Sequence, residues 1–441
     1  MYDVEAQEFK DRRRDLMKRM GPGGVAVLFG EPERTRSNDT EYPYRPSSDI
    51  LYLTGFREPG CVLVIAPGHP EGEFVLFVRP RDPEAETWTG RRFGVDGAKS
   101  EFGADAAFDI ATLDTELPKL LANRDTLFWP LGLDHEFDRK MFTFYTNLRF
   151  VRRKAAECPE RIGDVRDFMH EMRLFKTPEE LKLMRRAAEI TSEAHALAMR
   201  RTKPGIFEFE LQAVIESYFR HHGGEFPAYT SIVGGGDNAT ILHYTENRSS
   251  LTSGDLVLID AGCEYHFYAA DITRTWPVSG KFEGAGRDAY QAVLEVQEAS
   301  IADVVVGRPY NELQERCVRR LSQVLIDLNV FKGSVDEIVE KESYKRYYPH
   351  NVGHWLGIDV HDVGSYFDQS KAWRKLEPGM VLTIEPGLYF PAHDEAVPPE
   401  LRGVGIRIED DIVVTATGGE NLTAACPKSI EAIENIIGQG L

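Results

Sequence analysis

Two aspartates in the middle of the chain flank a turn, in a setting where carboxylates do chemistry. Asp260 ends the apolar run 256–259, and Asp271 opens a second β-rich run. We expect the two runs to be paired antiparallel strands, with a turn at Gly262. A buried carboxylate is costly without a cation or a proton, and two facing aspartates ionise together only beside a positive partner. A bound cation and a pair of capping or salt-bridging aspartates are both compatible with this pattern.

Three further candidate ligands come later in the chain, each beside an apolar segment. His354 lies between two glycines in the segment 353–357, Glu385 ends the apolar run 380–384, and Glu409 lies in the strand-like run 406–414. Together with the two aspartates they form a hard, oxygen-rich set. Such a set suits two divalent cations of the Mn²⁺ or Co²⁺ kind better than a thiolate zinc site.

In order and context, these five residues match the metal ligands of the pita-bread metallopeptidases. The segment 350–364 resembles the proline-specific branch of that family, and the segment 41–56 is similar to aminopeptidase P (Xaa-Pro aminopeptidase). The resemblance implies an α/β domain followed by a pseudo-twofold pita-bread catalytic domain. It also implies two divalent metal ions, most commonly Mn²⁺, with Asp271 and Glu409 bridging them, Asp260 serving one, and His354 and Glu385 serving the other.

The activity implied by the resemblance is hydrolysis of the bond between an N-terminal residue and a penultimate proline in peptides. Two close metals lower the pKa of a bridging water, so that hydroxide forms at neutral pH. The further residues that the resemblance implicates are His243, His361, Glu385 and Arg407 in catalysis, and His350, Tyr389 and Trp88 in substrate binding.

These further residues each have a proposed role and a plainer alternative. The two catalytic histidines would stabilise the oxyanion of the tetrahedral intermediate, and Glu385 would carry a proton from the attacking water to the leaving amine. Arg407 would orient a ligand carboxylate, helped by Tyr389. A lone histidine beside apolar residues is otherwise a structural one, and the arginine otherwise forms a plain ion pair.

Trp88 lies in a segment, 86–92, that resembles the part of the family's N-terminal domain that reaches a neighbouring subunit's active site. An exposed tryptophan in a polar loop would fit an interface anchor. The resemblance therefore implies a homo-oligomer, either a dimer or a tetramer, although packing within the N-terminal domain explains the residue equally well.

The composition bounds the class of protein. A chain of 441 residues predicts two or three domains, and a net charge of −19 argues against nucleic acid or anionic membranes as partners. The five cysteines are scattered and odd in number, which favours reduced, buried thiols in a cytoplasmic protein. The first residues contain no apolar core typical of a secretory signal, and no apolar run is long enough to span a membrane.

The N-terminal part of the chain is expected to form an α/β domain over residues 1–174. Its pattern predicts an amphipathic helix at 5–20, a polar loop at 34–49, and the following elements. The expected strands are 25–29, 61–66 and 74–77, and the expected helices are 112–122 and 136–147.

A catalytic domain is expected over residues 175–441. Thr177, Pro178 and Glu180 form a capping box that predicts a helix to about residue 201. A break at 203–205 and a second helix at 207–221 follow, and then strands to about residue 278.

The same order recurs in the second half of this domain. Helices are expected at 287–305 and 311–328, with strands after them. Gly205 and Gly307 are each followed by Glu-Leu at the fifth and sixth positions, and Gly254 and Gly379 each precede a candidate ligand by six positions. We interpret this repetition as an internal duplication in which each half supplies ligands to a central site.

Three rival functions remain open at this point. Prolidase shares the ligands, creatinase shares the fold but works without metals, and some relatives are non-catalytic binding proteins. The complete ligand set argues against the last two. Proline forms a tertiary amide without an N–H, so a general peptidase that binds that N–H fails on such substrates.

Overall fold

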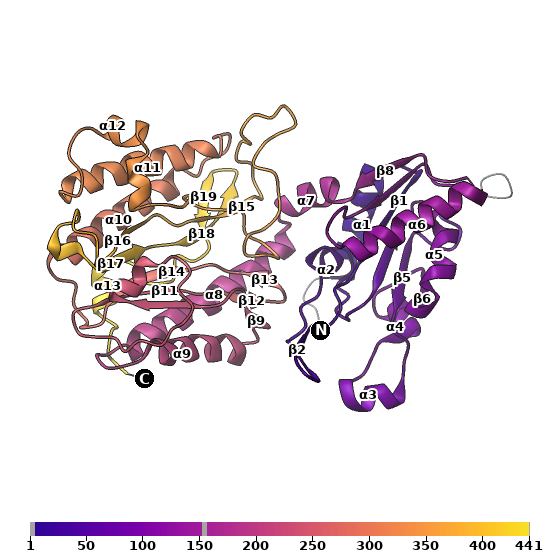
Figure 1. Cartoon of the computed structure of the whole chain (residues 1–441), viewed down its shortest axis with the longest axis horizontal. Helices are drawn as coiled ribbons and strands as arrows, with labels where there is room; N and C mark the ends of the chain where they lie inside the picture. The colour runs from indigo at the N-terminus through magenta and orange to yellow at the C-terminus, as the bar shows by residue number, and fades with distance from the viewer. Residues whose placement is uncertain (1–4, 152–156, 441) are drawn as a thin grey trace. The chain divides into compact units, whose positions relative to one another are not determined.

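The chain folds into two compact units. The computed structural model describes residues 5–151 and 157–440 (Figure 1). The first unit is Met1–Arg173 and the second is Leu174–Leu441. Within the described ranges, no helix combines the length and the apolar character needed to cross a bilayer.

A six-stranded mixed sheet forms the centre of the first unit, in the order β6-β5-β4-β1-β7-β8. β1 runs antiparallel to β4 and parallel to β7. The strands of this unit are β1 (Gly24–Phe29), β2 (Thr35–Ser37), β3 (Thr40–Glu41), β4 (Val62–Ile65), β5 (Phe74–Val78), β6 (Ala106–Asp109), β7 (Thr126–Trp129) and β8 (Arg161–Asp164). Its α-helices are α1 (Ala6–Met20), α2 (Ser48–Thr54), α3 (Pro83–Thr89), α4 (Gly94–Ser100), α5 (Leu113–Leu121), α6 (His135–Val151) and α7 (Arg166–Leu174), the last of which ends one residue into the second unit.

The predicted helices and strands of this unit are confirmed, with one exception. The segment 34–49 is not simply a loop, because it forms the β2–β3 hairpin and the start of α2. Both hairpin strands are fully exposed, so the segment carries no apolar alternation that would reveal a strand.

Helices and short sheets alternate in the second unit. Its α-helices are α8 (Pro178–Arg201), α9 (Glu208–His221), α10 (Gly284–Ala302), α11 (Asn311–Asp327), α12 (Val335–Glu340) and α13 (Ile430–Glu434). Its strands are β9 (Phe226–Pro227), β10 (Ile232–Gly235), β11 (Leu256–Asp260), β12 (Cys263–Tyr265), β13 (Tyr268–Ala269), β14 (Thr273–Pro277), β15 (Val381–Ile384), β16 (Gly387–Phe390), β17 (Val404–Arg407), β18 (Asp410–Thr415) and β19 (Gly418–Asn421). The capping box at Thr177 and Glu180 is present and begins α8.

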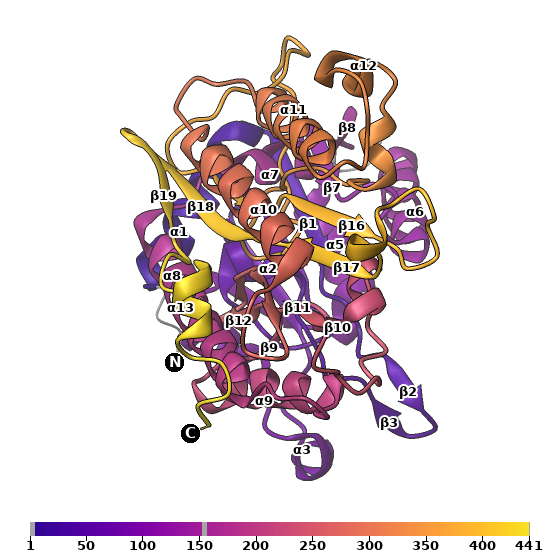
Figure 2. The same cartoon turned by 90° about the vertical axis from the view of Figure 1, so that its left-hand side faces the viewer.

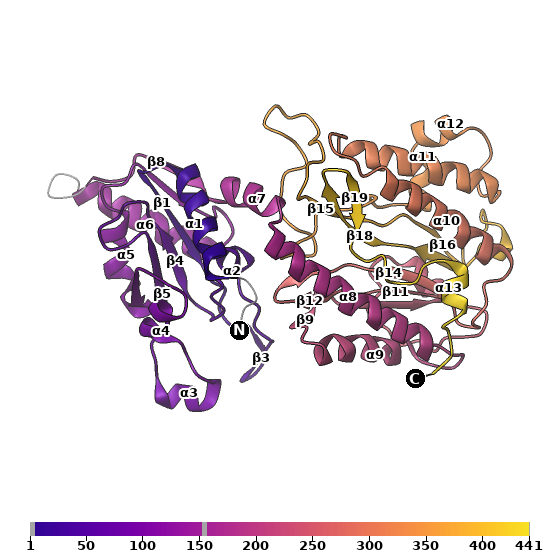
Figure 3. The ribbon, with the colours of Figure 1, turned by 180° about the vertical axis from the view of Figure 1, so that it is seen from behind.

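Helix pairs lie on opposite sides of these sheets. α8 and α9 run along one side, and α10 and α11 along the other, as the views from the front, the side and behind show (Figures 1, 2 and 3). One apolar core joins the inner faces of all four helices to the strands. The sheets are therefore covered on both sides, and their strand ends are left to form a site.

The order of elements repeats within this unit, as the sequence predicts. The pair α8–α9 is followed by the antiparallel strands β11 and β14, and the pair α10–α11 by the antiparallel strands β15 and β18. Asp260 ends β11 and Glu385 directly follows β15, so the two residues occupy comparable places. Superposition of the two halves remains a prediction.

Two strand predictions need correction. β11 and β14 are paired, but the small β12–β13 hairpin separates them, and Asp271 lies just before β14 rather than within it. The run 406–414 is two strands, and Glu409 lies between β17 and β18. In both places the carboxylate lies between two strands rather than within one.

Candidate active site

A cavity of about 660 Å³ opens between the two halves of the second unit. Its walls contain all five proposed ligands and four of the further candidates. The candidate residues that line it are His243, Asp260, Asp271, His350, His354, His361, Glu385, Arg407 and Glu409.

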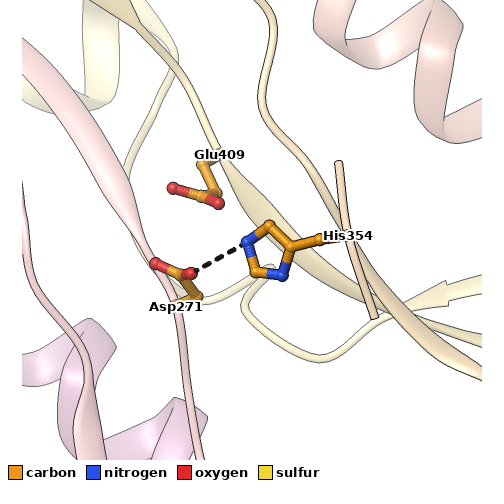
Figure 4. A group of neighbouring side chains, drawn as sticks. All are labelled: Asp271, His354 and Glu409. Carbon is orange, nitrogen blue, oxygen red and sulfur yellow. Dashed lines mark ion pairs between the residues drawn. The ribbon is translucent and has the colours of Figure 1, made fainter. Parts of the chain in front are cut away.

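Asp271, His354 and Glu409 form the tightest group in the cavity. Each offers one ligand atom, and these atoms lie within 4.8 Å of one another. Figure 4 shows the three side chains converging from separate segments. Nε2 of His354 lies 3.4 Å from Oδ2 of Asp271. The backbone joins the halves here too, because the N–H of Glu409 donates to the carbonyl of Thr273 over 3.0 Å.

The other two carboxylates flank this group. Oε1 of Glu385 lies 3.7 Å from Nε2 of His354. Oδ2 of Asp260 accepts a hydrogen bond from Nη2 of Arg407 over 2.6 Å. The structure thus brings all five predicted ligands to one cavity, three of them in mutual reach.

Buried negative charge dominates the electrostatics of the site. Burial, together with the neighbouring carboxylates, raises the pKa of Asp271 and holds that of Glu409 well above its ordinary value. Burial raises the pKa of Glu385 to about 7. Although burial opposes charge on His354, its hydrogen bond to Asp271 and the nearby Glu385 raise its pKa to about 9.

Divalent cations fit this donor set. Four carboxylates share one buried space with a single arginine, so positive charge would relieve their mutual repulsion. Carboxylate oxygens and an imidazole nitrogen are ligands that Mn²⁺, Co²⁺, Zn²⁺ and Fe²⁺ accept. The chemistry of the cavity therefore supports a divalent-metal centre.

A chain of hydrogen bonds connects Arg407 to His350. Nη1 of Arg407 donates to the hydroxyl of Tyr389 over 3.0 Å, and that hydroxyl lies 2.8 Å from Nε2 of His350. Nδ1 of His350 lies 2.8 Å from the carbonyl oxygen of Asn351, so Nδ1 carries the proton and Nε2 accepts from the tyrosine. Arg407 thereby links Asp260 to a histidine on the cavity wall.

The remaining sequence candidates are placed differently. The ring of His361 packs edge-on against that of His354, with centroids 4.3 Å apart. His243 also lines the cavity, next to Leu242 in the chain. Trp88 belongs to the first unit, where it lies on α3 rather than in a loop and is 86 % exposed.

Sequence reasoning missed two polar neighbours of the proposed ligands. The hydroxyl of Tyr229 lies 2.5 Å from Oδ1 of Asp260 and also contacts Oδ1 of Asp271. Thr273 donates to Oε2 of Glu409 over 2.6 Å. Thr273 lies two residues after Asp271, so its place in the sequence could have identified it as a neighbour of the site. The sequence around Tyr229 contains no motif that would have done the same.

Chain pairing puts Tyr229 in place. β9 pairs with β12, and the N–H of Ala228 donates to the carbonyl of Gly262 over 2.8 Å. A Cβ on Gly262 would lie 1.7 Å from the carbonyl oxygen of Ala270 and 3.1 Å from the tyrosine ring. Only glycine allows this close approach of backbones.

A buried glutamate anchors the segment that carries His243. Oε1 of Glu208 accepts from the N–H of Gly235 and the amide of Asn238, each over 2.9 Å. Oε2 accepts from the hydroxyl of Tyr244 over 2.9 Å and from the N–H of Ser249 over 2.8 Å. Four donors from one segment therefore converge on one carboxylate.

Fold and site together define a metal-dependent hydrolase of the peptidase kind, and comparison with known proteins agrees. The profile of metallopeptidase family M24 matches residues 182–416, and that of the aminopeptidase P N-terminal domain matches residues 9–129. The chain belongs to metallopeptidase family M24, and the predicted resemblance to aminopeptidase P is confirmed.

Individual proteins and solved structures match the chain over almost its whole length. The chain is 47 % identical to a Xaa-Pro aminopeptidase of Escherichia coli, over 99 % of both chains. It superposes on aminopeptidase PepP of Pseudomonas aeruginosa with a TM-score of 0.96 and 44 % identity, covering 99 % of this chain and 98 % of that one. A zinc-substituted aminopeptidase P of E. coli in complex with product has a TM-score of 0.94 and 46 % identity, with the same coverage. The predicted fold, an α/β domain before a pita-bread catalytic domain, is thereby confirmed.

Proposed function

We propose that the chain is a Xaa-Pro aminopeptidase, which removes the first residue from peptides with proline in second position. One observation carries the proposal: a complete set of four carboxylates, three of them buried, and His354 lines one cavity of a chain that matches Xaa-Pro aminopeptidases over 99 % of its length. A non-catalytic binding protein has no need to keep such a costly cluster of buried charge.

The metal-binding residues are proposed from position and resemblance. Asp271 and Glu409 would hold both ions, Asp260 one of them, and His354 and Glu385 the other. Mn²⁺ is our proposal for the ion, on family resemblance and on the hard donor set. When bound, two such ions supply a water of lowered pKa, which can attack an amide at neutral pH.

The residues around the ligands would orient the substrate and move protons. Oε of Glu385 would take a proton from the attacking water and pass it to the leaving proline nitrogen. His243 and His361 line the cavity and would donate hydrogen bonds to the oxygen of the scissile carbonyl as charge develops on it. Arg407 would keep Asp260 in a fixed orientation.

Proline recognition would rest on shape rather than on a backbone donor. The nitrogen of proline carries no hydrogen, so the site cannot use an N–H at that position. The chain from Arg407 through Tyr389 fixes His350 on the cavity wall, where we place it and Tyr389 among the substrate-binding residues.

Location and assembly are also proposed. The five cysteines are free and buried, which supports a reducing, cytoplasmic setting. The exposed Trp88 supports a homo-oligomer in which it meets another copy of the chain.

The test measures metal and product together. The purified chain is stripped with a chelator and reloaded separately with Mn²⁺, Co²⁺ and Zn²⁺. Metal content is then compared with the release of free alanine from Ala-Pro-Ala. We expect release only from the loaded protein, fastest with Mn²⁺. A fully loaded chain that releases no alanine would contradict the proposal.

A further inference from the structure

A buried ion pair lies directly beside one of the cavity histidines. Nζ of Lys176 lies 2.9 Å from Oδ2 of Asp362, and only 1 % of either side chain is exposed. Asp362 follows His361, whose ring lines the cavity. The carboxylate is thus held inside the protein while the neighbouring imidazole faces the site.

Both partners are also fixed through their backbones. The N–H of Lys176 donates to the carbonyl oxygen of Gly379 over 2.8 Å. The N–H of Asp362 donates to the carbonyl oxygen of Trp355 over 2.9 Å. Gly379 lies in the turn before β15, and Trp355 follows the candidate ligand His354. The pair therefore ties the start of the catalytic unit to the segment that carries His354 and His361.

Close packing leaves the pair little freedom to move. A Cβ on Gly357 would lie 2.1 Å from Oδ2 of Asp362 and 2.8 Å from Cε of Lys176. The carbonyl of Gly357 accepts from the N–H of Ala269 over 2.8 Å, so the backbone cannot retreat. The backbone at Gly357, four residues before His361, therefore packs directly against the ammonium and the carboxylate.

Stability alone does not account for this arrangement. Replacing a whole buried ion pair by neutral residues of similar size is often neutral or stabilising, whereas removing one partner costs about 3–5 kcal/mol. What the charged pair adds is a directed, short-range restraint on Asp362. That restraint passes to His361 through a single peptide bond.

We propose that Lys176 is a positioning residue for His361 in peptide hydrolysis. It touches neither substrate nor metal ligand, and acts by holding Asp362 so that the imidazole stays packed edge-on against His354. The inference rests on the proposed function for the role of His361, and on the contacts above for the role of Lys176.

The test uses the paired variant Lys176→Met/Asp362→Asn, which removes both charges and keeps side-chain size. The matched control is Lys281→Met/Glu434→Gln, a lysine–carboxylate pair at 2.8 Å on the surface of the same unit. Folding, metal content, and kcat and KM for Ala-Pro-Ala are measured for each. We expect unchanged metal content, a similar KM and at least a tenfold lower kcat for the buried pair only.

Adding His361→Ala to each background separates positioning from general damage. In the wild-type background, loss of an oxyanion donor lowers kcat by about 10²–10³. In the paired-variant background we expect the further loss to be at least tenfold smaller than in the wild-type background, because the histidine is already displaced. An equal loss in both backgrounds would overturn the inference. If the paired variant does not fold, Lys176→Met/Asp362→Leu, which replaces the pair by apolar side chains of similar size, takes its place in the same comparison.

A crystal structure of the paired variant gives a readout that does not depend on activity. We expect the His361 ring to leave its edge-on contact with His354. A ring still 4.3 Å from His354 would contradict the positioning role even if the enzyme hydrolyses peptides, whereas failure of the wild-type chain to hydrolyse them contradicts the proposed function instead.

Discussion

Arg407 and Asp260 form a short, buried contact across the two halves of the catalytic unit. Nη2 of the arginine lies 2.6 Å from Oδ2 of the aspartate, and only 5 % and 12 % of their side chains are exposed. The arginine ends β17 and the aspartate ends β11, 147 positions earlier. The restraint on this proposed ligand in the first half therefore comes from the second half.

Removing the arginine should weaken metal binding. We expect Arg407→Met to lower metal affinity or activity about 10–100-fold, as loss of a group that orients a ligand does. Arg407→Lys should restore little, because one ammonium cannot reach Asp260, Tyr389 and Thr273 together. Calorimetric titration of the stripped protein with Mn²⁺ measures the change. Arg287→Met, at an exposed position on α10, serves as the control, and equal affinities would contradict the prediction.

Neutralising Asp271, which we propose as a bridging ligand, should remove metal and turnover together. We expect Asp271→Asn to lose most of its bound metal and all measurable hydrolysis, since an amide cannot balance the charge of two cations. Metal analysis after gel filtration and alanine release from Ala-Pro-Ala are the measurements. The exposed Asp288→Asn is the matched control. An Asp271→Asn protein that keeps two metals and full activity would remove Asp271 from the ligand set.

The carboxylate of Glu208 should matter for both stability and rate. In Glu208→Gln, an NH₂ group replaces one of the two carboxylate oxygens, and each of these oxygens accepts from two donors. The NH₂ group would face those donors without accepting from them, so we expect the free energy of unfolding to fall by about 2 kcal/mol or more. A lower kcat should accompany this change, because His243 adjoins Tyr244 in the anchored segment. Urea unfolding and steady-state kinetics test both parts. The exposed Glu246→Gln should change stability by no more than about 0.5 kcal/mol.

Peptide length should distinguish this enzyme from a prolidase. A dipeptidase must capture the carboxylate of proline with a nearby cation, whereas an aminopeptidase leaves that side open. We expect kcat/KM at saturating Mn²⁺ to be higher for Ala-Pro-Ala and for longer peptides than for Ala-Pro. A clear preference for Ala-Pro would reassign the substrate and leave the fold and the metal centre intact.

Local patterns predicted much of this structure. The box at Thr177 and Glu180 satisfies free N–H groups within one helical turn, so it marks the start of α8 without tertiary information. Asp260 and Glu385 stand at the ends of apolar runs at equal distances from a glycine, and the structure places both at strand ends.

Long-range pairing explains what sequence reasoning missed. Tyr229 reaches Asp260 and Asp271 because β9 pairs with β12. No residue spacing in the sequence predicts that pairing. Arg407 contacts a candidate ligand carboxylate, as predicted, but that carboxylate belongs to the distant Asp260, which no local spacing could identify. The exposed β2–β3 hairpin lacks the apolar alternation that reveals strands.

The reactivity of the buried cysteines should report the fraction of molecules that are unfolded. Burial raises the pKa of Cys61, Cys263 and Cys317 to about 12 and that of Cys426 to about 11, and Cys158 is buried as well. Alkylating reagents attack thiolates, so the cysteines of the folded chain should react with them very slowly at neutral pH. Molecules that open would take up label at five positions. Mass spectrometry of alkylated samples would then count open molecules in a mixture, without any engineered label and while the enzyme is at work.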